Sequence, residues 1–348
     1  MAKQATKKKS TRGRKPIEYT KEELERQPMI MLVCGMMEVG KSYRNHQEFK
    51  QYMTDNPRTG KVGRKILAFD TNDDDFPEWK TVSPDHIKAL TKVSARRIRP
   101  YNKDGSPMDL DDKREVVDKI MRFFQNGLIV LDDMDNYMMG AKSQSMIGAM
   151  VTVRHRGVDL ILGHQSIAKI TTTEWQNCTC LRLHHQVDEV KAYKDRIPNY
   201  RLVRIAQHIV DEQYIMAVVA YRKGLISKQE SIVRKSYFVY VNMREQTITG
   251  CSRKAFIRAA KKFIDQEENG LIRMMLLEQT HKNQPVYKNR NEAVVKLITD
   301  YLQYHDDNTF KPLEENTPHK GSRGNRSRDA IQKPFAVLYN NEKTNVSS

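Results

Sequence analysis

The sequence predicts an α/β fold in which helices cover both faces of a mainly parallel sheet. Two observations indicate this fold class. Short apolar runs of strand length alternate along the chain with segments of helical periodicity. Several of these runs are unbroken, as in strands that are buried on both faces, and polar residues follow them directly.

The elements up to residue 186 follow this alternation. Strands are predicted over residues 29–34, 65–71, 94–101, 127–133, 158–166 and 178–186. Helices are predicted over residues 19–28, 42–55, 109–126 and 143–157. The helix over 109–126 begins with acids and ends in Asn-Gly, which are typical start and stop signals. The charges of 94–101 make that strand a candidate for the edge of the sheet.

Beyond residue 186 helices predominate, and the segment up to about residue 212 is expected to be mostly helical. Residues 214–222 (YIMAVVAYR) and 235–243 (KSYFVYVNM) alternate in polarity, so we expect them to pair as a late antiparallel element. Helices are predicted within 247–280 and over 289–305. The polar composition that follows is typical of a disordered tail.

The composition describes a soluble globular protein with polar extensions. Of 348 residues, 39% are hydrophobic and 30% charged, and no apolar run approaches the ~20 residues that cross a bilayer. The charged N-terminus lacks the apolar segment of a secretory signal. The four scattered cysteines indicate reduced thiols in a compartment like the cytosol.

One cluster of potential metal ligands stands out in CTCLRLHH: Cys178, Cys180, His184 and His185. The segment alternates like a strand, which sends neighbouring side chains to opposite faces, and no second ligand pair has the spacing of a zinc site. We therefore interpret the segment as a strand.

Positive charge is concentrated near both ends of the chain, and the formal net charge is +17. No acid precedes Glu18, and a second basic stretch, HKGSRGNRSR, occupies 319–328. Such runs often neutralise a polyanion, so nucleic-acid contact is favoured over the alternative that they only keep the protein in solution.

Residues 35–42, GMMEVGKS, match the P-loop (Walker A) pattern G-x-x-x-x-G-K-[ST] between a predicted strand and a predicted helix. Lys41 would reach the β- and γ-phosphates of ATP, and Ser42 would offer its hydroxyl to Mg²⁺, while the helix N-terminus favours anions. The alternative is a glycine turn that binds no ligand. The residues expected to bind ATP are Gly35, Met36, Met37, Glu38, Val39, Gly40, Lys41, Ser42 and Tyr43.

A P-loop also needs carboxylates, and the strand LIVLDD ends in two. Asp132 directly follows the apolar run and is assigned to Mg²⁺. Asp133, or less favourably Asp135, would polarise the attacking water. For Asp135 a solvated acidic turn is the favoured interpretation.

Three further residues are candidates from the next strand and the segment before it. Gln165 ends the strand VDLILGHQS, and its amide could contact the γ-phosphate or position the water, unless it serves as a helix cap or a core hydrogen bond. Arg154 and Arg156 precede that strand. In a ring of identical subunits they could reach the neighbour's site, and the alternative is a plain surface role.

With these residues in hand, the chain resembles the FtsK/HerA superfamily of DNA-pumping P-loop ATPases, and within it the Zot-like proteins of small phages. The resemblance rests on MLVCGMMEVGKSYRN, GLIVLDDMDNY and RHRGVDLILGHQSIAKI with the following NCTCLRLHH, and covers roughly residues 28–190. It implies phosphate and Mg²⁺ contacts for Lys41 and Ser42, metal and water carboxylates at Asp132 and Asp133, and a sensor at Gln165.

Two features depart from that family. Val39 stands where many members have a second glycine. Zot proteins usually carry a membrane span after the ATPase domain, whereas this chain shows none there. The second departure favours a motor in the host cytoplasm, or associated with the virion, over one anchored in a membrane.

These inferences give a working division of the chain and a functional hypothesis. Four parts are expected: a basic disordered arm (1–19), a P-loop ATPase domain of RecA/FtsK-HerA-like type (20–265), C-terminal helices (266–305) and a polar tail (306–348).

The leading hypothesis is an ATP-hydrolysing DNA translocase, a pentameric or hexameric ring that packages or exports a phage-type genome and contacts a capsid or vertex protein. The strandedness of the DNA stays open. The alternatives are an ATP-binding switch or assembly factor and, less favoured, a small-molecule kinase.

Overall fold

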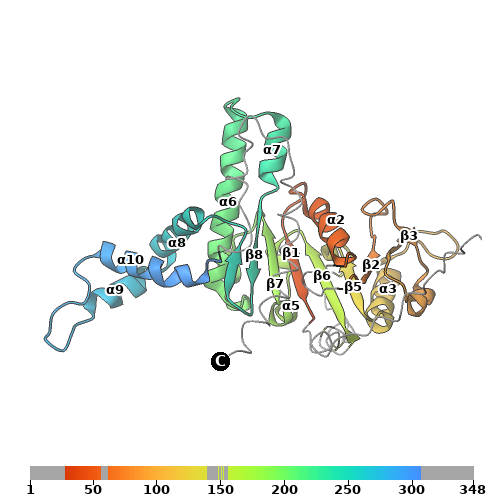
Figure 1. Ribbon diagram of the computed structural model, residues 1–348, viewed down its shortest axis with the longest axis horizontal. Helices are drawn as coiled ribbons and strands as arrows, with labels where there is room; N and C mark the ends of the chain where they lie inside the picture. Colours follow the sequence, from red (N-terminus) through yellow and green to blue (C-terminus); the bar gives the residue numbers. More distant parts are fainter. Residues whose placement is uncertain are drawn as a thin grey trace, which may run out of the picture.

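A single nine-stranded sheet runs through the part of the chain that the computed structural model describes, residues 28–55, 62–138, 148, 150, 152 and 156–306 (Figure 1). Its strands are β1 (Ile30–Cys34), β2 (Lys65–Phe69), β3 (Lys80–Thr81), β4 (Ala95–Ile98), β5 (Gly127–Leu131), β6 (Val158–His164), β7 (Cys180–His184), β8 (Phe238–Asn242) and β9 (Thr247–Thr249). The spatial order is β3-β4-β2-β5-β6-β1-β7-β8-β9. All pairs from β3 to β7 are parallel, and β8 and β9 add antiparallel pairs. The predicted α/β fold with a mainly parallel sheet is confirmed.

Helices cover both faces of the sheet. They are α2 (Lys41–Tyr52), α3 (Leu110–Phe123), α5 (Thr172–Asn177), α6 (Tyr200–Arg222), α7 (Lys228–Lys235), α8 (Arg253–Glu267), α9 (Asn269–Leu277) and α10 (Arg290–Tyr301). Neighbouring residues of β1 belong to different cores: Leu32 lies in the core that also contains residues of α3, α5, α6 and α8, whereas Val33 lies in the core that contains residues of α2. Burial on both faces explains why the central strands are unbroken apolar runs.

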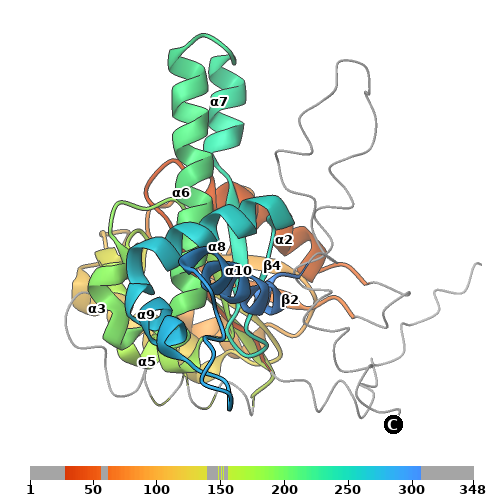
Figure 2. The ribbon, with the colours of Figure 1, turned by 90° about the vertical axis from the view of Figure 1, so that its left-hand side faces the viewer.

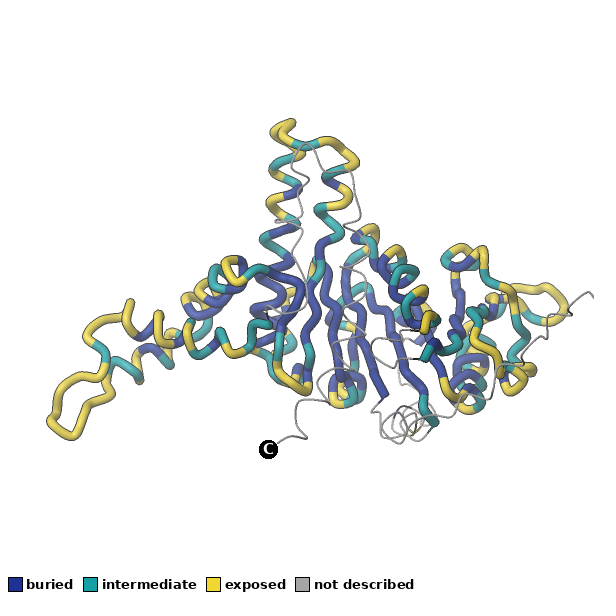
Figure 3. The backbone as a smooth tube through the Cα atoms, in the orientation of Figure 1, coloured by how far each residue is buried: buried dark blue, intermediate teal, exposed yellow. Residues whose placement is uncertain are grey.

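Helices α6 and α7 pair and project from the edge of the sheet at which the parallel strands end (Figures 1 and 2). The far part of this helical hairpin is exposed, whereas the strands are buried (Figure 3).

The prediction of a strand over 214–222 is wrong, because these residues form the C-terminal half of α6. Gln213 and Ala217 are buried at a spacing of four, which is helical, whereas Ile215 and Val219, two residues after each of them, are exposed. The strand predicted over 235–243 exists as β8, but it pairs with β7 and β9. The edge strand next to β4 is the two-residue β3, so β4 is not itself the edge.

Several sequence predictions fall outside the described residues. They are the helix over 19–28, the basic arm, most of the helix over 143–157 and the tail beyond 306. Among the described helices, none has the length and apolarity needed to span a bilayer.

Candidate active site

The loop between β1 and α2 has the conformation that its glycines permit. Gly40 has φ +77° and precedes the first turn of α2, and a Cβ there would lie 2.9 Å from the Ser236 Cβ. A Cβ at Gly35 would lie 2.6 Å from the Cβ of His184. A larger residue is therefore excluded at both positions. At Gly40 both the left-handed backbone angle and the contact with Ser236 exclude it, and at Gly35 the contact with His184 does.

Lys41 lies inside this loop. Its side chain is buried, and Nζ donates hydrogen bonds to the carbonyls of Gly35 (2.5 Å) and Met36 (3.0 Å). Ser42 follows in the first turn of α2 and is half-buried. The loop therefore presents one ammonium, one hydroxyl and a helix N-terminus at the same place, which is the donor set of a phosphate site.

The other predicted loop residues divide by exposure. Val39 is buried, and its Cγ2 lies 3.0 Å from the position of a Cβ at Gly35, so it fills the inside of the loop. Met37 and Tyr43 are 66% and 71% exposed, and their side chains face solvent. Glu38 is exposed and has φ +61°. Any contact of these last three residues with a nucleotide thus comes from their main chain or from the rim.

Asp132 stands at the end of β5, two strands from β1, with β6 between them. It is 4% exposed, and its Oδ2 accepts a 3.4 Å hydrogen bond from Asn45 in α2. Burial and the neighbouring Asp133 raise the pKa of Asp132, and Lys41 opposes the rise. Through Asn45 the structure joins this carboxylate to helix α2, whose first residue is Lys41.

Asn45 is fixed from its other side. Its Oδ1 accepts a 2.5 Å hydrogen bond from Arg182 of β7, and Arg182 is in turn paired with buried Glu48 at 2.8 Å. The amide is thus oriented with its oxygen toward the guanidinium and its NH₂ toward Asp132. Asn45 lies four residues after Lys41 on the same helical face, a spacing that could have identified it from the sequence.

Asp133 and Gln165 also meet, as the sequence predicted for residues that end neighbouring parallel strands. The Gln165 amide donates a 3.2 Å hydrogen bond to Asp133 Oδ1, and Asn72 donates at 3.3 Å to Oδ2. Asp133 has φ +46°, a left-handed conformation that Asp and Asn adopt more readily than most residues. A carboxylate and an amide side by side can hold and polarise a water.

The expectation of a solvated turn at Asp135 is wrong. Its side chain is only 11% exposed and lies 2.9 Å from His164 Nδ1. Its Oδ1 faces the His164 ring and its Oδ2 accepts a hydrogen bond from the main-chain N–H of Gln165, so protein groups fix both oxygens of Asp135.

The two arginine predictions do not add to this site within one chain. Arg154 lies outside the described residues. Arg156 precedes β6, whereas Gln165 follows it, and a seven-residue strand separates the two ends by roughly 20 Å. Its predicted role in trans would need a second copy.

The loop after β2 adds acids that the sequence analysis did not assign to the site. Ligand oxygens of Asp70, Asp74 and Asp75 lie within 4.8 Å of one another. Burial and the carboxylates around it, Asp132 first among them, raise the pKa of Asp75 to about 6. Asp70 is already paired with Arg97 at 2.6 Å. The segment with Cys178, Cys180, His184 and His185 contains β7 (Cys180–His184), which confirms its interpretation as a strand.

The site fits a magnesium nucleotide by its donor chemistry. Mg²⁺ prefers oxygen ligands, and the Ser42 hydroxyl and the Asp132 carboxylate supply them. Together with the parallel sheet and the loop between β1 and α2, these features give the chain the fold of a P-loop NTPase.

No family model and no curated protein matches the chain. Among solved structures, the genome packaging NTPase B204 from Sulfolobus turreted icosahedral virus 2 in complex with ATP-gammaS is similar at 15% identity and a TM-score of 0.38, over 64% of this chain and 95% of that one. The N-terminal domain of zonular occludens toxin from Neisseria meningitidis is similar at 14% identity and a TM-score of 0.28, over 45% and 76%. EssC (ATPases 2 and 3) from Geobacillus thermodenitrificans is similar at 12% identity and a TM-score of 0.32, over 49% and 34%.

Two of these neighbours are described as an NTPase and as ATPases. At such identities and TM-scores the likeness concerns the fold alone, so the side chains described above carry the functional assignment.

Proposed function

We propose that the chain hydrolyses ATP and uses the reaction to move DNA as a ring-forming packaging or assembly motor of a virus. One observation carries the ATPase part: Asn45 of α2, four residues after the buried Lys41, binds Asp132 at the same sheet edge where Gln165 binds Asp133. The DNA part is supported by the net charge of +17 and by the FtsK/HerA-like motifs of the sequence.

The residues have distinct roles in this proposal. Lys41 and the loop amides bind the phosphates, and Ser42 and Asp132 would hold Mg²⁺, which supplies charge neutralisation on the phosphates when bound. Gln165 and Asp133 orient a water, and Asp133 accepts its proton as the oxygen attacks the γ-phosphorus and ADP leaves. Asn45 keeps the carboxylate of Asp132 directed into the site.

The test compares ATP hydrolysis by the wild type and two variants, with and without DNA. Lys41→Ala should lose turnover by about 100-fold or more, because the phosphates lose their main side-chain cation. Asp133→Asn should bind ATP without turning it over, and asparagine tolerates the left-handed backbone angle there. Lys50→Ala, an exposed lysine of the same helix, is the matched control and should be unaffected.

Normal turnover in Lys41→Ala would remove the ATPase assignment. The rival function, an ATP-binding switch that gates assembly, predicts a rate that DNA does not change. Turnover that rises severalfold with DNA favours the motor, whereas an unstimulated rate favours the switch.

A further inference from the structure

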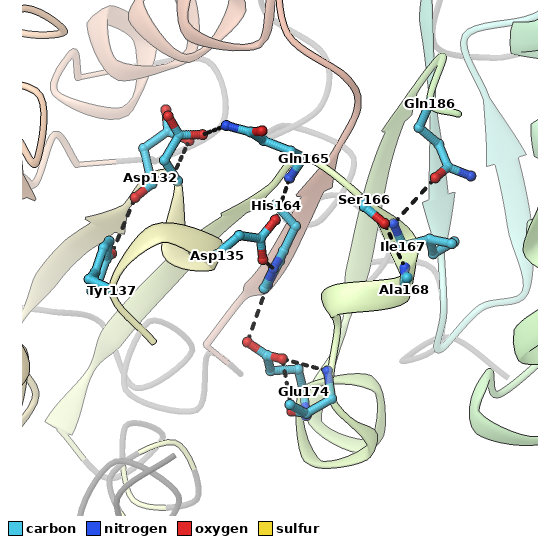
Figure 4. Close-up of polar contacts among 12 residues, drawn as sticks. Asp132, Asp135, Tyr137, His164, Gln165, Ser166, Ile167, Ala168, Glu174 and Gln186 are labelled. Carbon is cyan, nitrogen blue, oxygen red and sulfur yellow. Dashed lines mark hydrogen bonds and ion pairs between the residues drawn. The ribbon is translucent and has the colours of Figure 1, made fainter. Parts of the chain in front are cut away.

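His164, the last residue of β6, is buried between two carboxylates. Its Nδ1 lies 2.9 Å from Asp135 Oδ1 and its Nε2 lies 3.2 Å from Glu174 Oε1 (Figure 4). The side chain is 2% exposed. Burial lowers the pKa of His164, but the two carboxylates raise it further, so the net shift is upward. A ring that meets an anion at each nitrogen is favoured in the cationic form, with both nitrogens protonated.

The far end of this arrangement is fixed to a helix start. Glu174 is completely buried, and its Oε2 accepts hydrogen bonds from the Thr171 main-chain N–H (2.7 Å) and hydroxyl (2.8 Å) in the capping box of α5. The other oxygen, Oε1, is left to face the imidazole. Glu174 therefore holds one side of the His164 ring in place.

The near end reaches the water-positioning pair. Asp135 uses Oδ1 for His164 and Oδ2 for the main-chain N–H of Gln165, at 2.8 Å (Figure 4). The Gln165 side chain then donates to Asp133. A continuous path of polar contacts runs from Glu174 through His164, Asp135 and Gln165 to Asp133.

The main chain of His164 contacts the phosphate loop as well. Its carbonyl accepts a 3.2 Å hydrogen bond from the N–H of Gly35, the first residue of that loop. One residue thus connects to the phosphate loop by its carbonyl and to the water-positioning pair by its ring. Fixing both at once is what in-line attack on a bound phosphate requires.

We propose that His164 is a positioning residue for ATP hydrolysis: held by Glu174, it acts through Asp135 to fix the backbone of Gln165 and thereby the Gln165–Asp133 pair. The inference rests on the proposed function of the same site. His164 is assigned no contact with substrate, and its loss should affect the rate of the chemical step more than the binding of ATP.

Two substitutions distinguish the contribution of Nδ1 from that of Nε2. The amide NH₂ of asparagine occupies roughly the place of Nδ1, and that of glutamine roughly the place of Nε2. His164→Asn keeps a donor for Asp135 and should retain kcat within about fivefold, whereas His164→Gln loses it and should lower kcat by about 100-fold, as misplacement by an ångström can. In both variants the KM for ATP should stay within about threefold. His281→Gln, at an exposed position, is the control.

Equal kcat losses in the two variants, or a change that falls on KM alone, would overturn the positioning role. Binding of a non-hydrolysable ATP analogue and thermal unfolding are measured for each variant, so that loss of the fold is recognised. If the wild type itself fails to hydrolyse ATP, the proposed function fails instead.

A second measurement needs no turnover. In wild-type protein with ¹⁵N-labelled histidine, the His164 ring should show both nitrogens protonated at pH 7. The signal can be identified by its position between two carboxylates, through its shift in Glu174→Gln. A ring that carries a proton on Nε2 alone would contradict the proposal, because Nδ1 could not then donate to Asp135.

Discussion

Asp132 keeps its place because residue 163 on the neighbouring strand has no side chain. A Cβ at Gly163 would lie 2.0 Å from Asp132 Oδ1 and 3.1 Å from its Cα, far inside any real contact distance. The absence of a side chain at Gly163 thus leaves the space in which the Asp132 carboxylate lies. The sequence LILGHQS shows a glycine before a polar strand end, but only the fold shows that the strand beside it carries Asp132.

Gly163→Ala should therefore displace the Asp132 carboxylate and lower ATP turnover by about 100-fold, with a loss of about 1–3 kcal/mol in stability from overpacking. Steady-state hydrolysis and urea unfolding measure the two effects. Gly270→Ala is the matched control, because a Cβ in that helix meets nothing within 4 Å and its φ is not positive. It should leave turnover unchanged and stabilise by up to about 1 kcal/mol. Wild-type turnover in Gly163→Ala would show that Asp132 is not needed where it lies.

At the scale of elements, helix α6 holds a histidine whose burial makes folding sensitive to acid. His208 is 4% exposed, and burial, with Arg204 and Lys262 nearby, lowers its pKa to about 3. Its unfolded pKa is near 6.5, so between pH 6.5 and 3 the unfolded chain binds the additional proton. Stability from this group is complete above pH 6.5 and falls as the pH drops through that window.

His208→Gln should remove that dependence, since glutamine does not titrate. From pH 7 to pH 5 the wild type should lose about 2 kcal/mol more than the variant in the free energy of unfolding. Urea denaturation at both pH values gives the comparison, and other buried histidines affect both proteins alike. Parallel losses in the two proteins would mean that His208 is protonated in the folded state at pH 5.

The elements themselves were largely predictable, since burial on both faces gives the central strands a pattern that sequence shows directly. The exception, residues 214–222, contains β-branched side chains in a helix whose far half projects from the core. Burial there is confined to positions such as Gln213 and Ala217, so the apolar periodicity that would indicate a helix is weak. Exposed Ile215 and Val219 imitate the alternation of a strand.

The structure places Asp132, Asp133 and Gln165 at one edge of the sheet, where the sequence predicted that their strands end, and their roles stay predictions. The predicted site was incomplete where the role arises from two distant segments that fold together. His164 and Glu174 are ten residues apart, and Asn45 and Arg182 are far more distant in sequence, so their pairing follows from topology alone. Asp135 was misinterpreted for the same reason, because the strand that buries it comes thirty residues later.

At the scale of the whole molecule, much of the positive charge and the acidic site belong to different parts of the sequence. Seven of the basic residues lie within the first sixteen positions, outside the described part of the chain: Lys3, Lys7, Lys8, Lys9, Arg12, Arg14 and Lys15. The site edge carries Asp70, Asp74 and Asp75 besides its own two carboxylates. A DNA strand is therefore expected to contact the basic segments rather than the nucleotide edge.

Deleting residues 1–16 should weaken DNA binding and flatten its dependence on salt. If all seven charges contact phosphates, the slope of log K against log salt falls by up to about 6 on double-stranded DNA and about 5 on single-stranded DNA. A neutral arm of equal length should behave like the deletion, and a shuffled arm of equal charge like the wild type. An unchanged slope in the deletion would mean that the arm does not bind DNA.

The exposed side chains at the nucleotide edge bear on assembly. We expect a neighbouring subunit to cover Met37 and Tyr43, which are 66% and 71% exposed next to the phosphate loop. A ring would close over this edge, so a non-hydrolysable ATP analogue should shift the particle from the 40.6 kDa chain to roughly 200 or 240 kDa, the mass of a pentamer or hexamer.

Tyr43→Ser should reduce that assembly. Val295→Ser, at a 62% exposed position on α10 far from α2, should not (Figure 1). Mass photometry at several protein concentrations reads the result. A monomer under all conditions would contradict the ring and favour the ATP-binding switch, because a single chain offers no neighbour to complete a closed path around DNA.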